Sequence, residues 1–272
     1  MKIALYYRHI EPTAEPSLDE LVSTLHAKGI DTCELHNQGE ADGCDFLFSI
    51  GGDGTLLSSV QFVDAEHPEL FPPVLGINFG HLGFLTTVGR ENLHGMAECL
   101  LNGQYTLEKR TLLQLSTPHA PHSDQYALNE VFLHRSEESS LLRTEVSVDG
   151  REVACYGGDG VIVATPTGST AYSLSCGGPI LTPDSRCLVI TPISAHTLTL
   201  RPVIVPDNVQ IGLRVDSPCF LGIDSNRRMV EANTELTIRL APVTVRLVRL
   251  GNQDFFAAIR EKLMWGTGGA KA

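Results

Sequence analysis

The sequence has few of the features that mark disulfide-bonded, zinc-binding or nucleic-acid-binding proteins. Its seven cysteines include no Cys-x-x-Cys pair, which favours reduced thiols over a disulfide framework or a zinc site. None of the ten histidines has a partner at metal-ligand spacing on a helix. The net charge of −12 argues against a broad face for nucleic acid, although a local basic pocket for a small anion is compatible with it.

Membrane and export signals are also missing. No apolar run approaches the roughly 18 residues that span a bilayer, and Met1–Arg8 is too short and too soon charged for a signal peptide. Hydrophobic residues make up 42% and charged residues 19%, as in an ordinary globular protein. We therefore expect a cytoplasmic protein with no membrane partner, and 272 residues suit one large domain or two modest ones.

The first hundred residues alternate strand-like and helix-like segments. A capping box, Ser17-Leu-Asp-Glu20, predicts the start of a first helix, and Gly29 predicts its end. Alternation of this kind implies a parallel sheet covered on both faces, with ligands beyond the carboxyl ends of its strands. The expected strands are 2–7, 30–35, 45–50 and 74–78, and the later helices are 55–65 and 90–101.

After about residue 105 the pattern changes to short β-like runs separated by turns such as Asp149-Gly150, which suits an antiparallel sandwich. The expected strands are 111–116, 127–134, 143–148, 161–164, 188–191, 209–215 and 234–249. Residues 252–264 return to helical spacing, and 266–272 are expected to be disordered. The predicted organisation is a Rossmann-like α/β domain over 1–104, an all-β sandwich over 105–250 with a cleft between them, and a C-terminal helix and tail over 251–272 that pack back.

The most informative motif is Gly51-Gly-Asp-Gly-Thr55, which follows an apolar strand and leads into a helix. Such a turn is an anion site, because unpaired N–H groups and the helix dipole point at one place. Glycine lets the backbone approach phosphates and adopt positive φ. A carboxylate would repel phosphate, so Asp53 either holds a metal or takes a proton from a nearby hydroxyl. The motif is not a P-loop, and a simple turn with a solvated aspartate is the alternative.

Two further stretches carry polar residues at special positions. Gly80 and Gly83 follow a strand and predict a second close approach of the backbone, in a ligand loop or a structural one. Asn129 and Glu130 sit inside an apolar strand, where adjacent residues face opposite ways, so at least one points at a core or a cleft. For both to contact one ligand, regular strand pairing must break there. The alternative is an exposed Glu beside a capping Asn.

Residues 157–178 are the densest region. Gly157-Gly-Asp-Gly160 repeats the aspartate in a glycine turn, and a hydroxyl-rich run, Thr165–Ser175, follows a short strand. We predict that this run is not core, because burial would leave too many hydroxyls unpaired. It suits a nucleotide lining, with Tyr172 as a stacking face, and a Ser/Thr surface loop is the alternative. The stretch Asp224-Ser225-Asn226 is either a hairpin turn alone or part of the site.

In this order, the blocks resemble the NAD kinase family. The matching stretches are Gly51–Thr55, Gly76–Leu85, Asn129-Glu130, Asp159-Gly160, Thr165–Gly178 and Ile193–Pro202. The resemblance implies an α/β domain and a β-sandwich domain with NAD bound between them. It implies phosphorylation of the 2′-hydroxyl of the adenosine ribose by ATP or polyphosphate with a divalent metal ion, expected to be Mg²⁺. By analogy with the family we also expect a homotetramer or homodimer.

The resemblance assigns roles to individual residues. Asp53 falls on the family's proton acceptor, Asn129 and Glu130 on the pair that contacts adenine and ribose, and Asp159 on an aspartate near the nicotinamide side. Asn226 falls on a polar residue after a late Asp-Ser. The predicted binding residues are Gly51, Gly52, Asp53, Gly54, Thr55, Asn78, Asn129, Glu130, Asp159, Thr167, Thr170, Ala171, Tyr172, Ser173, Leu174, Ser175 and Asn226.

One position departs from the family. Many members carry a basic or bulky residue two before the second aspartate, and here it is Gly157, so the charge beside Asp159 must come from elsewhere or be missing. The main rival is a lipid kinase with the same first motif, which would need an apolar acyl channel. A non-catalytic nucleotide sensor would be expected to lose Asp53. The choice between ATP and polyphosphate, and between NAD and NADH, stays open.

Overall fold

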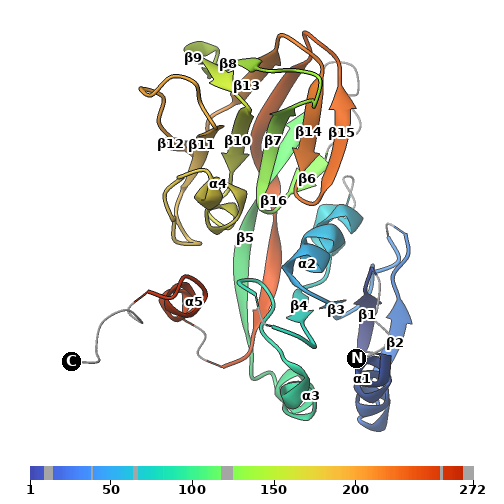
Figure 1. Cartoon of the computed structure of the whole chain (residues 1–272). Helices are drawn as coiled ribbons and strands as arrows, with labels where there is room; N and C mark the ends of the chain where they lie inside the picture. Colours follow the sequence, from blue (N-terminus) through green and yellow to red (C-terminus); the bar gives the residue numbers. More distant parts are fainter. Residues whose placement is uncertain are drawn as a thin grey trace, which may run out of the picture. The chain divides into compact units, whose positions relative to one another are not determined.

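The computed structural model describes residues 1–8, 15–37, 39–63, 67–81, 83–117, 125–251 and 254–265, and the chain divides into two compact units (Figure 1). The first unit consists of Met1–Lys109 and Val245–Ala272, and the second of Arg110–Thr244. Two long strands, β5 (Thr106–Ser116) and β16 (Glu235–Arg249), have residues in both units.

The first unit is built on a parallel sheet. Its strands are β1 (Lys2–Tyr6), β2 (Asp31–Glu34), β3 (Phe46–Ile50) and β4 (Val74–Ile77), in the spatial order β2-β1-β3-β4. All three pairings are parallel, and the end of β16 joins β4 in the same direction. Every residue of β3 and β4 is buried, which fits a sheet covered on both faces.

Helices cover both faces of this sheet. Helices α1 (Glu15–Ala27) and α3 (Leu93–Leu101) share one core with β3 and β4. Helix α2 (Asp53–Ser59) lies on the other face, where its Leu56 faces Gly76. Short 3₁₀ turns are η1 (Val60–Phe62), η2 (Pro68–Leu70) and η3 (Arg90–Asn92). This arrangement confirms the predicted α/β domain.

Two predicted helix starts are wrong. Ser17 does not cap α1, because the helix is already formed at Glu15 and Ser17 is buried inside it. Helix α2 begins at Asp53 rather than Thr55, because Gly52 takes the N-cap position with extended backbone. The predicted end at Gly29 is confirmed, since this glycine has positive φ.

The second unit is a sandwich of two antiparallel layers, as predicted. One layer has the order β16-β13-β8-β9, with β5 on β16 and β6 on β5, and the other has the order β12-β11-β10-β7-β14-β15. Apolar residues from both layers form a common core. The strands are β6 (Gln125–Ala127), β7 (Glu130–Arg135), β8 (Leu142–Val148), β9 (Arg151–Gly158), β10 (Gly160–Ala164), β11 (Cys187–Ile193), β12 (Val203–Pro206), β13 (Ile211–Val215), β14 (Cys219–Ile223) and β15 (Asn226–Val230).

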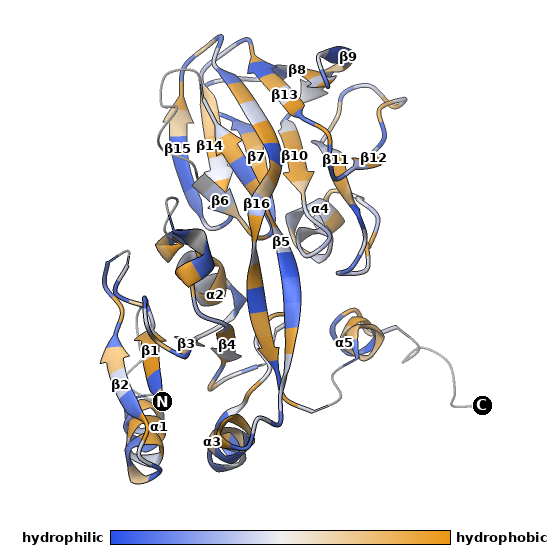
Figure 2. Cartoon of the chain, turned by 180° about the vertical axis from the view of Figure 1, so that it is seen from behind, coloured by the Kyte–Doolittle hydropathy of each residue, from blue (hydrophilic) through white to orange (hydrophobic). Residues whose placement is uncertain are grey.

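The strand β10 is buried on both faces and is coloured as hydrophobic in Figure 2. Val161 and Val163 enter the sandwich core, whereas Ile162 and Ala164 belong to a second cluster on the outer face of the layer. Tyr172 packs against that outer cluster. The segment with η4 (Gly168–Thr170) and α4 (Tyr172–Ser175) therefore starts at the end of β10 and contributes to the cover of its outer face.

Five of the described strands of the sandwich were not predicted, and the short β6 is one of them. β9 runs through Gly157 and Gly158, which we had read as a turn, and β15 has the polar, exposed sequence Asn226-Arg-Arg-Met-Val230. β12 and β14 were missed as well. The C-terminal helix is α5 (Phe255–Lys262), shorter than predicted, with Ile259 buried. The predicted disordered tail, 266–272, lies outside the described residues.

Candidate active site

The glycine turn of the first unit follows β3 and leads into α2, as predicted. Gly51 has φ +144°, in the region that favours glycine, and a Cβ there would collide with the Thr55 side chain. Gly52 is the N-cap of α2 and supplies no side-chain cap. The turn thus presents the N-terminus of α2, with Asp53 as its first residue.

The Asp53 carboxylate accepts four hydrogen bonds from one loop. Oδ1 accepts from Leu85 N (3.1 Å), Thr86 N (3.0 Å) and the Thr86 hydroxyl (3.1 Å), and Oδ2 accepts from Phe84 N (2.7 Å). These donors occupy Oδ1 fully and leave Oδ2 with room for a further partner. Asp53 is therefore not a solvated turn residue. Its carboxylate holds the loop 83–86 beside the start of α2.

Gly80 and Gly83, which predicted a close approach of the backbone, differ in what surrounds them. A Cβ at Gly83 would collide with the Asp53 carboxylate, whereas one at Gly80 would come only within 3.6 Å of Asn78 Oδ1. The predicted close approach is thus an approach to Asp53. Asn78 holds its own loop, since its side chain accepts from Gly80 N at 3.0 Å and donates to His81 O.

In the second unit, Asn129 lies in a break between two strands. β6 ends at Ala127 and β7 starts at Glu130, so residues 128 and 129 are bends rather than strand. This confirms the prediction that regular pairing breaks at the Asn-Glu pair. Both residues are more than nine-tenths buried, and Asn129 Oδ1 and Glu130 Oε2 have no hydrogen-bond partner within the described residues.

Glu130 lies next to another acid. Burial, and after it the neighbouring Asp224 carboxylate, raise the pKa of Glu130 to about 8, against a backbone N–H bond from Tyr172. Burial also raises the pKa of Asp224 to about 6, although three backbone N–H groups oppose that rise. A buried and a partly buried acid of raised pKa, beside orphaned polar atoms, are typical of a binding site rather than of a structural core.

Asp159 interrupts the run from β9 to β10 and pairs with a cation that we did not predict. Arg135 Nε lies 2.6 Å from Asp159 Oδ1, and this bond holds the pKa of Asp159 below its ordinary value. The Arg135 guanidinium also donates to Ser139 O at 2.8 Å. Arg135 therefore supplies the charge that Gly157 lacks. Nothing in the sequence singles it out beyond being a cation at a strand end.

The second Gly-Gly-Asp-Gly does not repeat the first, and that prediction is wrong. Gly158 and Gly160 are strand residues, and a Cβ at either would collide with neighbouring backbone at Ile193 or Leu133. These glycines are therefore needed for close strand packing. A strand, β10, follows them, where a helix follows the first motif. Only Asp159 is left outside the strands.

The prediction that Thr165–Ser175 is not core is wrong for residues 165–169 and for Ser173. Thr165, Ser169 and Ser173 are fully buried, and their hydroxyls find partners within the chain, such as Ser173 with Thr191 at 2.8 Å. Thr167 is also buried and accepts from Arg110 at 3.2 Å. Because these hydroxyls are hydrogen-bonded within the chain, their burial does not carry the cost of unpaired polar groups that the prediction assumed.

The exposed part of this segment is its helical end. Tyr172 is half-buried, with its ring 5.3 Å from that of Phe132 in an edge contact, and Ser175 is exposed. Thr170 donates to Thr167 O at 3.3 Å. Ala171, Leu174 and Asn226 are also at least partly exposed, and Asn226 opens β15 directly after the Asp224-Ser225 turn.

The polar groups of the second unit mark two ends of one strand pair. Glu130 pairs with Ala164 at one end of β7 and β10, while Arg135 ends β7 and Asp159 precedes β10 at the other end. The five residue steps from 130 to 135 span about 17 Å, and Tyr172 lies near both Glu130 and Asp159. This spacing suits a long ligand with different groups at its ends, such as a dinucleotide.

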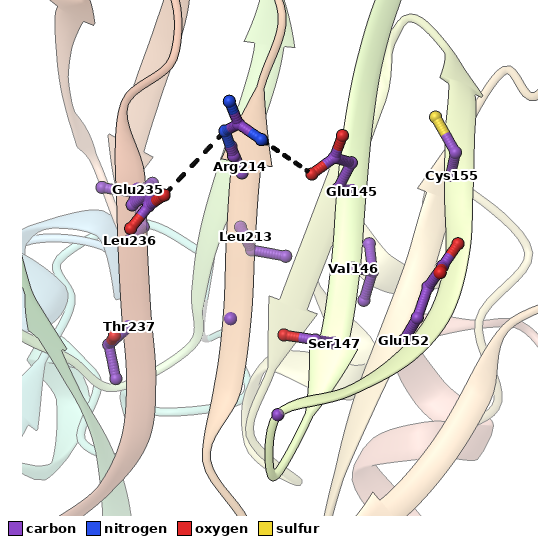
Figure 3. A pocket seen from close by; sticks show the side chains of 12 residues that line it. Glu145, Val146, Ser147, Glu152, Cys155, Leu213, Arg214, Glu235, Leu236 and Thr237 are labelled. Atoms are coloured by element: carbon purple, nitrogen blue, oxygen red, sulfur yellow. Dashed lines mark hydrogen bonds and ion pairs between the residues drawn. The ribbon is translucent and has the colours of Figure 1, made fainter.

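A separate hollow of about 580 Å³ lies on the outer face of β8, β9, β13 and β16 (Figure 3). Arg214 reaches Glu145 at 3.4 Å and Glu235 at 3.9 Å across it, all three side chains being about half exposed or more. None of the predicted site residues lines this hollow, and its arginine, Arg214, already pairs with Glu145 and Glu235. We assign it no role.

Comparison with known proteins places the chain. Residues 4–105 match the family model of the ATP-NAD kinase N-terminal domain, and residues 128–250 match that of the C-terminal domain. The chain belongs to the NAD kinase family. NAD kinase activity follows for it from the two matched domains, and the family resemblance predicted from the sequence is confirmed.

Curated NAD kinases are similar over most of the chain. An NAD kinase of Flavobacterium johnsoniae is 34% identical over 98% of both chains, and one of Cytophaga hutchinsonii is 40% identical over 82% of this chain and 76% of its own. Among solved structures, an Archaeoglobus fulgidus NAD kinase in complex with ATP matches with a TM-score of 0.80 at 25% identity, covering 97% of this chain and 99% of its own. A yeast NADH kinase complexed with NADH matches with a TM-score of 0.87 at 23% identity, over 100% of this chain and 89% of its own, and supports the fold alone.

Within the described residues, three or more His, Cys, Asp or Glu side chains do not come together in any group that could hold a metal ion. The described helices include none long and apolar enough to cross a bilayer.

Proposed function

We propose that this enzyme transfers the terminal phosphoryl group of ATP to the 2′-hydroxyl of the adenosine ribose of NAD, giving NADP and ADP, with Asp53 as the general base. The observation that carries the proposal is the Asp53 carboxylate. Oδ1 is held by three donors and Oδ2 by one, so the carboxylate is fixed in place while Oδ2 keeps a lone pair for an incoming hydroxyl.

A fixed carboxylate answers the chemical problem of this reaction. A ribose hydroxyl is a weak nucleophile, and Asp53 Oδ2 accepts its proton as the new phosphorus–oxygen bond forms and the bond to the leaving ADP breaks. Much of phosphoryl transfer is alignment and charge neutralisation. The backbone N–H groups at the start of α2, where Gly51, Gly52, Gly54 and Thr55 allow close approach, are the proposed contacts for phosphate oxygens.

NAD is held by the polar groups of the second unit. Asn129 Oδ1 and Glu130 Oε2 accept hydrogen bonds from the adenosine part, which gives these buried orphans their missing partners. The Arg135–Asp159 pair faces the nicotinamide side, and the exposed edge of Tyr172 lies along the ligand. Thr167, Thr170, Ala171, Ser173, Leu174 and Ser175 shape the segment that carries Tyr172, and Asn78 and Asn226 complete the proposed set.

The metal ion enters with the nucleotide. The described residues offer no metal cage of their own, and Mg²⁺ is commonly held through substrate phosphates with one or two carboxylates. We therefore extend the proposal to Mg²⁺ bound to ATP and assign no step to it here. Polyphosphate as an alternative donor belongs to the same proposal.

The proposal also includes the oligomeric state of the enzyme and its location in the cell. We propose a homotetramer or homodimer in the cytoplasm, without nucleic-acid or membrane partners. All seven cysteines are free, which supports a reducing compartment. Edge strands β9, β12 and β15 carry the exposed apolar side chains of Val153, Ile204 and Met229, which supports association of copies through sheet edges.

The test is direct. Purified protein incubated with ATP, Mg²⁺ and NAD should form NADP, detected with an NADP-specific dehydrogenase. Parallel reactions with polyphosphate or with NADH define donor and acceptor range. Phosphorylation of diacylglycerol or sphingosine with no NADP formed would overturn the proposal in favour of a lipid kinase.

A further inference from the structure

The break between β6 and β7 is held by one carboxylate from a distant hairpin. Asp224 lies in the turn between β14 and β15, with φ +48°. Its Oδ2 accepts from Leu128 N at 2.7 Å, and its Oδ1 accepts from Asn129 N at 2.8 Å and Glu130 N at 3.1 Å. Three consecutive N–H groups therefore converge on a single side chain 94 to 96 residues away.

The carbonyl groups of the same three residues are fixed as well. Leu128 O accepts from the Thr165 hydroxyl at 2.6 Å, Asn129 O accepts from Thr165 N at 2.9 Å, and Glu130 O accepts from Asp224 N at 2.9 Å. Asp224 and Thr165 thus satisfy all six backbone polar groups of the break. Asp224 alone accounts for four of them, so this one residue sets the backbone of the Asn-Glu pair.

The side chains on this backbone are left with unmet hydrogen-bonding capacity. Within the described residues Asn129 Oδ1 and Glu130 Oε2 are buried and unpaired, and each such group costs about 1–3 kcal/mol. The fixed backbone sets the positions and directions from which these two side chains start. Rigid, orphaned acceptors are the arrangement expected of groups prepared for a ligand.

We propose that Asp224 is a positioning residue for NAD: it holds the backbone of Leu128–Glu130 so that Asn129 and Glu130 face the adenosine part of the substrate. The inference rests on the proposed function. In this proposal Asp224 acts through the three backbone N–H groups from which its carboxylate accepts, and not as a substrate contact. Its effect on binding passes through the two residues whose backbone it holds.

A matched turn aspartate provides the control. Asp149 lies in the hairpin turn between β8 and β9 with φ +50°, and its carboxylate accepts one bond, from Gln210 N at 2.9 Å. Asparagine is tolerated at positive φ, so Asp149→Asn and Asp224→Asn both keep their turns. Only Asp224→Asn places an amide NH₂ against a backbone N–H of residues 128–130.

The experiment measures NAD affinity, ATP affinity and melting temperature for both variants. Asp224→Asn should weaken NAD binding about tenfold or more, with the KM for ATP unchanged, while Asp149→Asn should bind NAD like wild type. Equal NAD affinity in Asp224→Asn and wild type would overturn the inference. Absence of NAD binding and turnover in the wild type would instead overturn the proposed function.

A double-mutant cycle separates positioning from stability. In an Asn129→Ala/Glu130→Ala background, adding Asp224→Asn should change NAD affinity less than about twofold, because the positioned groups are already gone. The same tenfold loss in both backgrounds would contradict positioning. Should Asp224→Asn fail to fold, Thr165→Val removes the hydroxyl bond to Leu128 O, together with the bond that the hydroxyl accepts from Gly168 N. This variant should weaken NAD binding with the KM for ATP unchanged, and wild-type NAD affinity would count against the inference.

Discussion

At the scale of single residues, Asp53 combines a structural and a chemical task in one carboxylate. Its two oxygens are unequally used, three donors on Oδ1 and one on Oδ2. Its position in the glycine turn was predictable from the motif. Its bonds to the loop 83–86 were not, because nothing local in the sequence pairs residue 53 with residues some thirty positions later.

Arg135 is the residue whose role can be tested most cleanly by substitution. Arg135→Gln should raise the pKa of Asp159 toward its ordinary value of 3.8 and weaken NAD binding about two- to fivefold, as expected of a partly exposed ion pair. Carboxyl NMR titration and NAD titration measure the two effects. Arg186→Gln, which breaks the pair between the exposed Arg186 and Asp207, is the control and should change neither.

A rescue sharpens this test. A side chain at Gly157 has open space, since its Cβ would come only within 3.9 Å of Leu141 Cδ1. Gly157→Arg added to Arg135→Gln should therefore recover NAD affinity, at least in part. An unchanged Asp159 pKa in Arg135→Gln would contradict the pairing described here.

Glu130 predicts a pH dependence of stability. Its pKa in the folded protein is about 8, against 4.5 for the unfolded chain. Between these values the folded state holds a proton that the unfolded state has lost, so stability falls as pH rises through this window. Glu130→Gln removes this titration. Calorimetry from about pH 5 to 8 should show a steeper fall of Tm in wild type than in the variant, and parallel slopes would refute the raised pKa.

At the scale of elements, the loop 83–86 and helix α2 together fix the position of the Asp53 carboxylate. The loop donates every one of the hydrogen bonds that hold the Asp53 carboxylate, and Gly83 leaves the space for it. The glycine spacing indicated a close approach, but only the folded chain shows that the approached group is Asp53.

Gly83→Ala should displace the carboxylate and lower kcat on the order of 10²-fold, because small misplacements of reacting groups are costly. Gly80→Ala, whose Cβ meets nothing closer than 3.6 Å, is the matched control and should retain activity within about threefold. Steady-state kinetics on both variants provide the comparison. Similar activities for the two would show that the space at Gly83 does not matter.

Element boundaries show where sequence patterns stop being informative. Buried strands such as β3 and β10 were predicted from their apolar runs. The break at Asn129 was predicted because two adjacent strand residues can contact one ligand only where regular pairing stops. The strands β9 and β15 were missed, because glycines and exposed polar residues hide them. Hydrogen bonds between distant segments, such as that of Asp224 to residues 128–130, have no local signal at all.

At the scale of the whole molecule, the order of motifs was sufficient to predict the family and both fold classes. The buried hydroxyls of Thr165–Ser175 show the limit of that reasoning. Composition indicates how many polar groups a segment has, and only the packed chain provides their partners.

The exposed apolar residues on edge strands predict self-association. Light scattering at micromolar concentration should give the mass of a dimer or tetramer of the 29.5 kDa chain. Ile204→Lys and Met229→Lys on β12 and β15 should lower that mass, because charge on an edge strand opposes pairing. A monomer mass for the wild type would reject this part of the proposal.

The measurement that tests the central claim most directly is the turnover of Asp53→Asn with saturating ATP and NAD. The amide oxygen can keep the three donors of Oδ1, but the variant has no carboxylate to take the ribose proton, so kcat should fall about 10²–10⁴-fold with NAD affinity nearly unchanged. Thr86→Val weakens the hold on the carboxylate without removing it and should lose less than about tenfold. NADP formation by Asp53→Asn at the wild-type rate would contradict the assignment of Asp53 as the base.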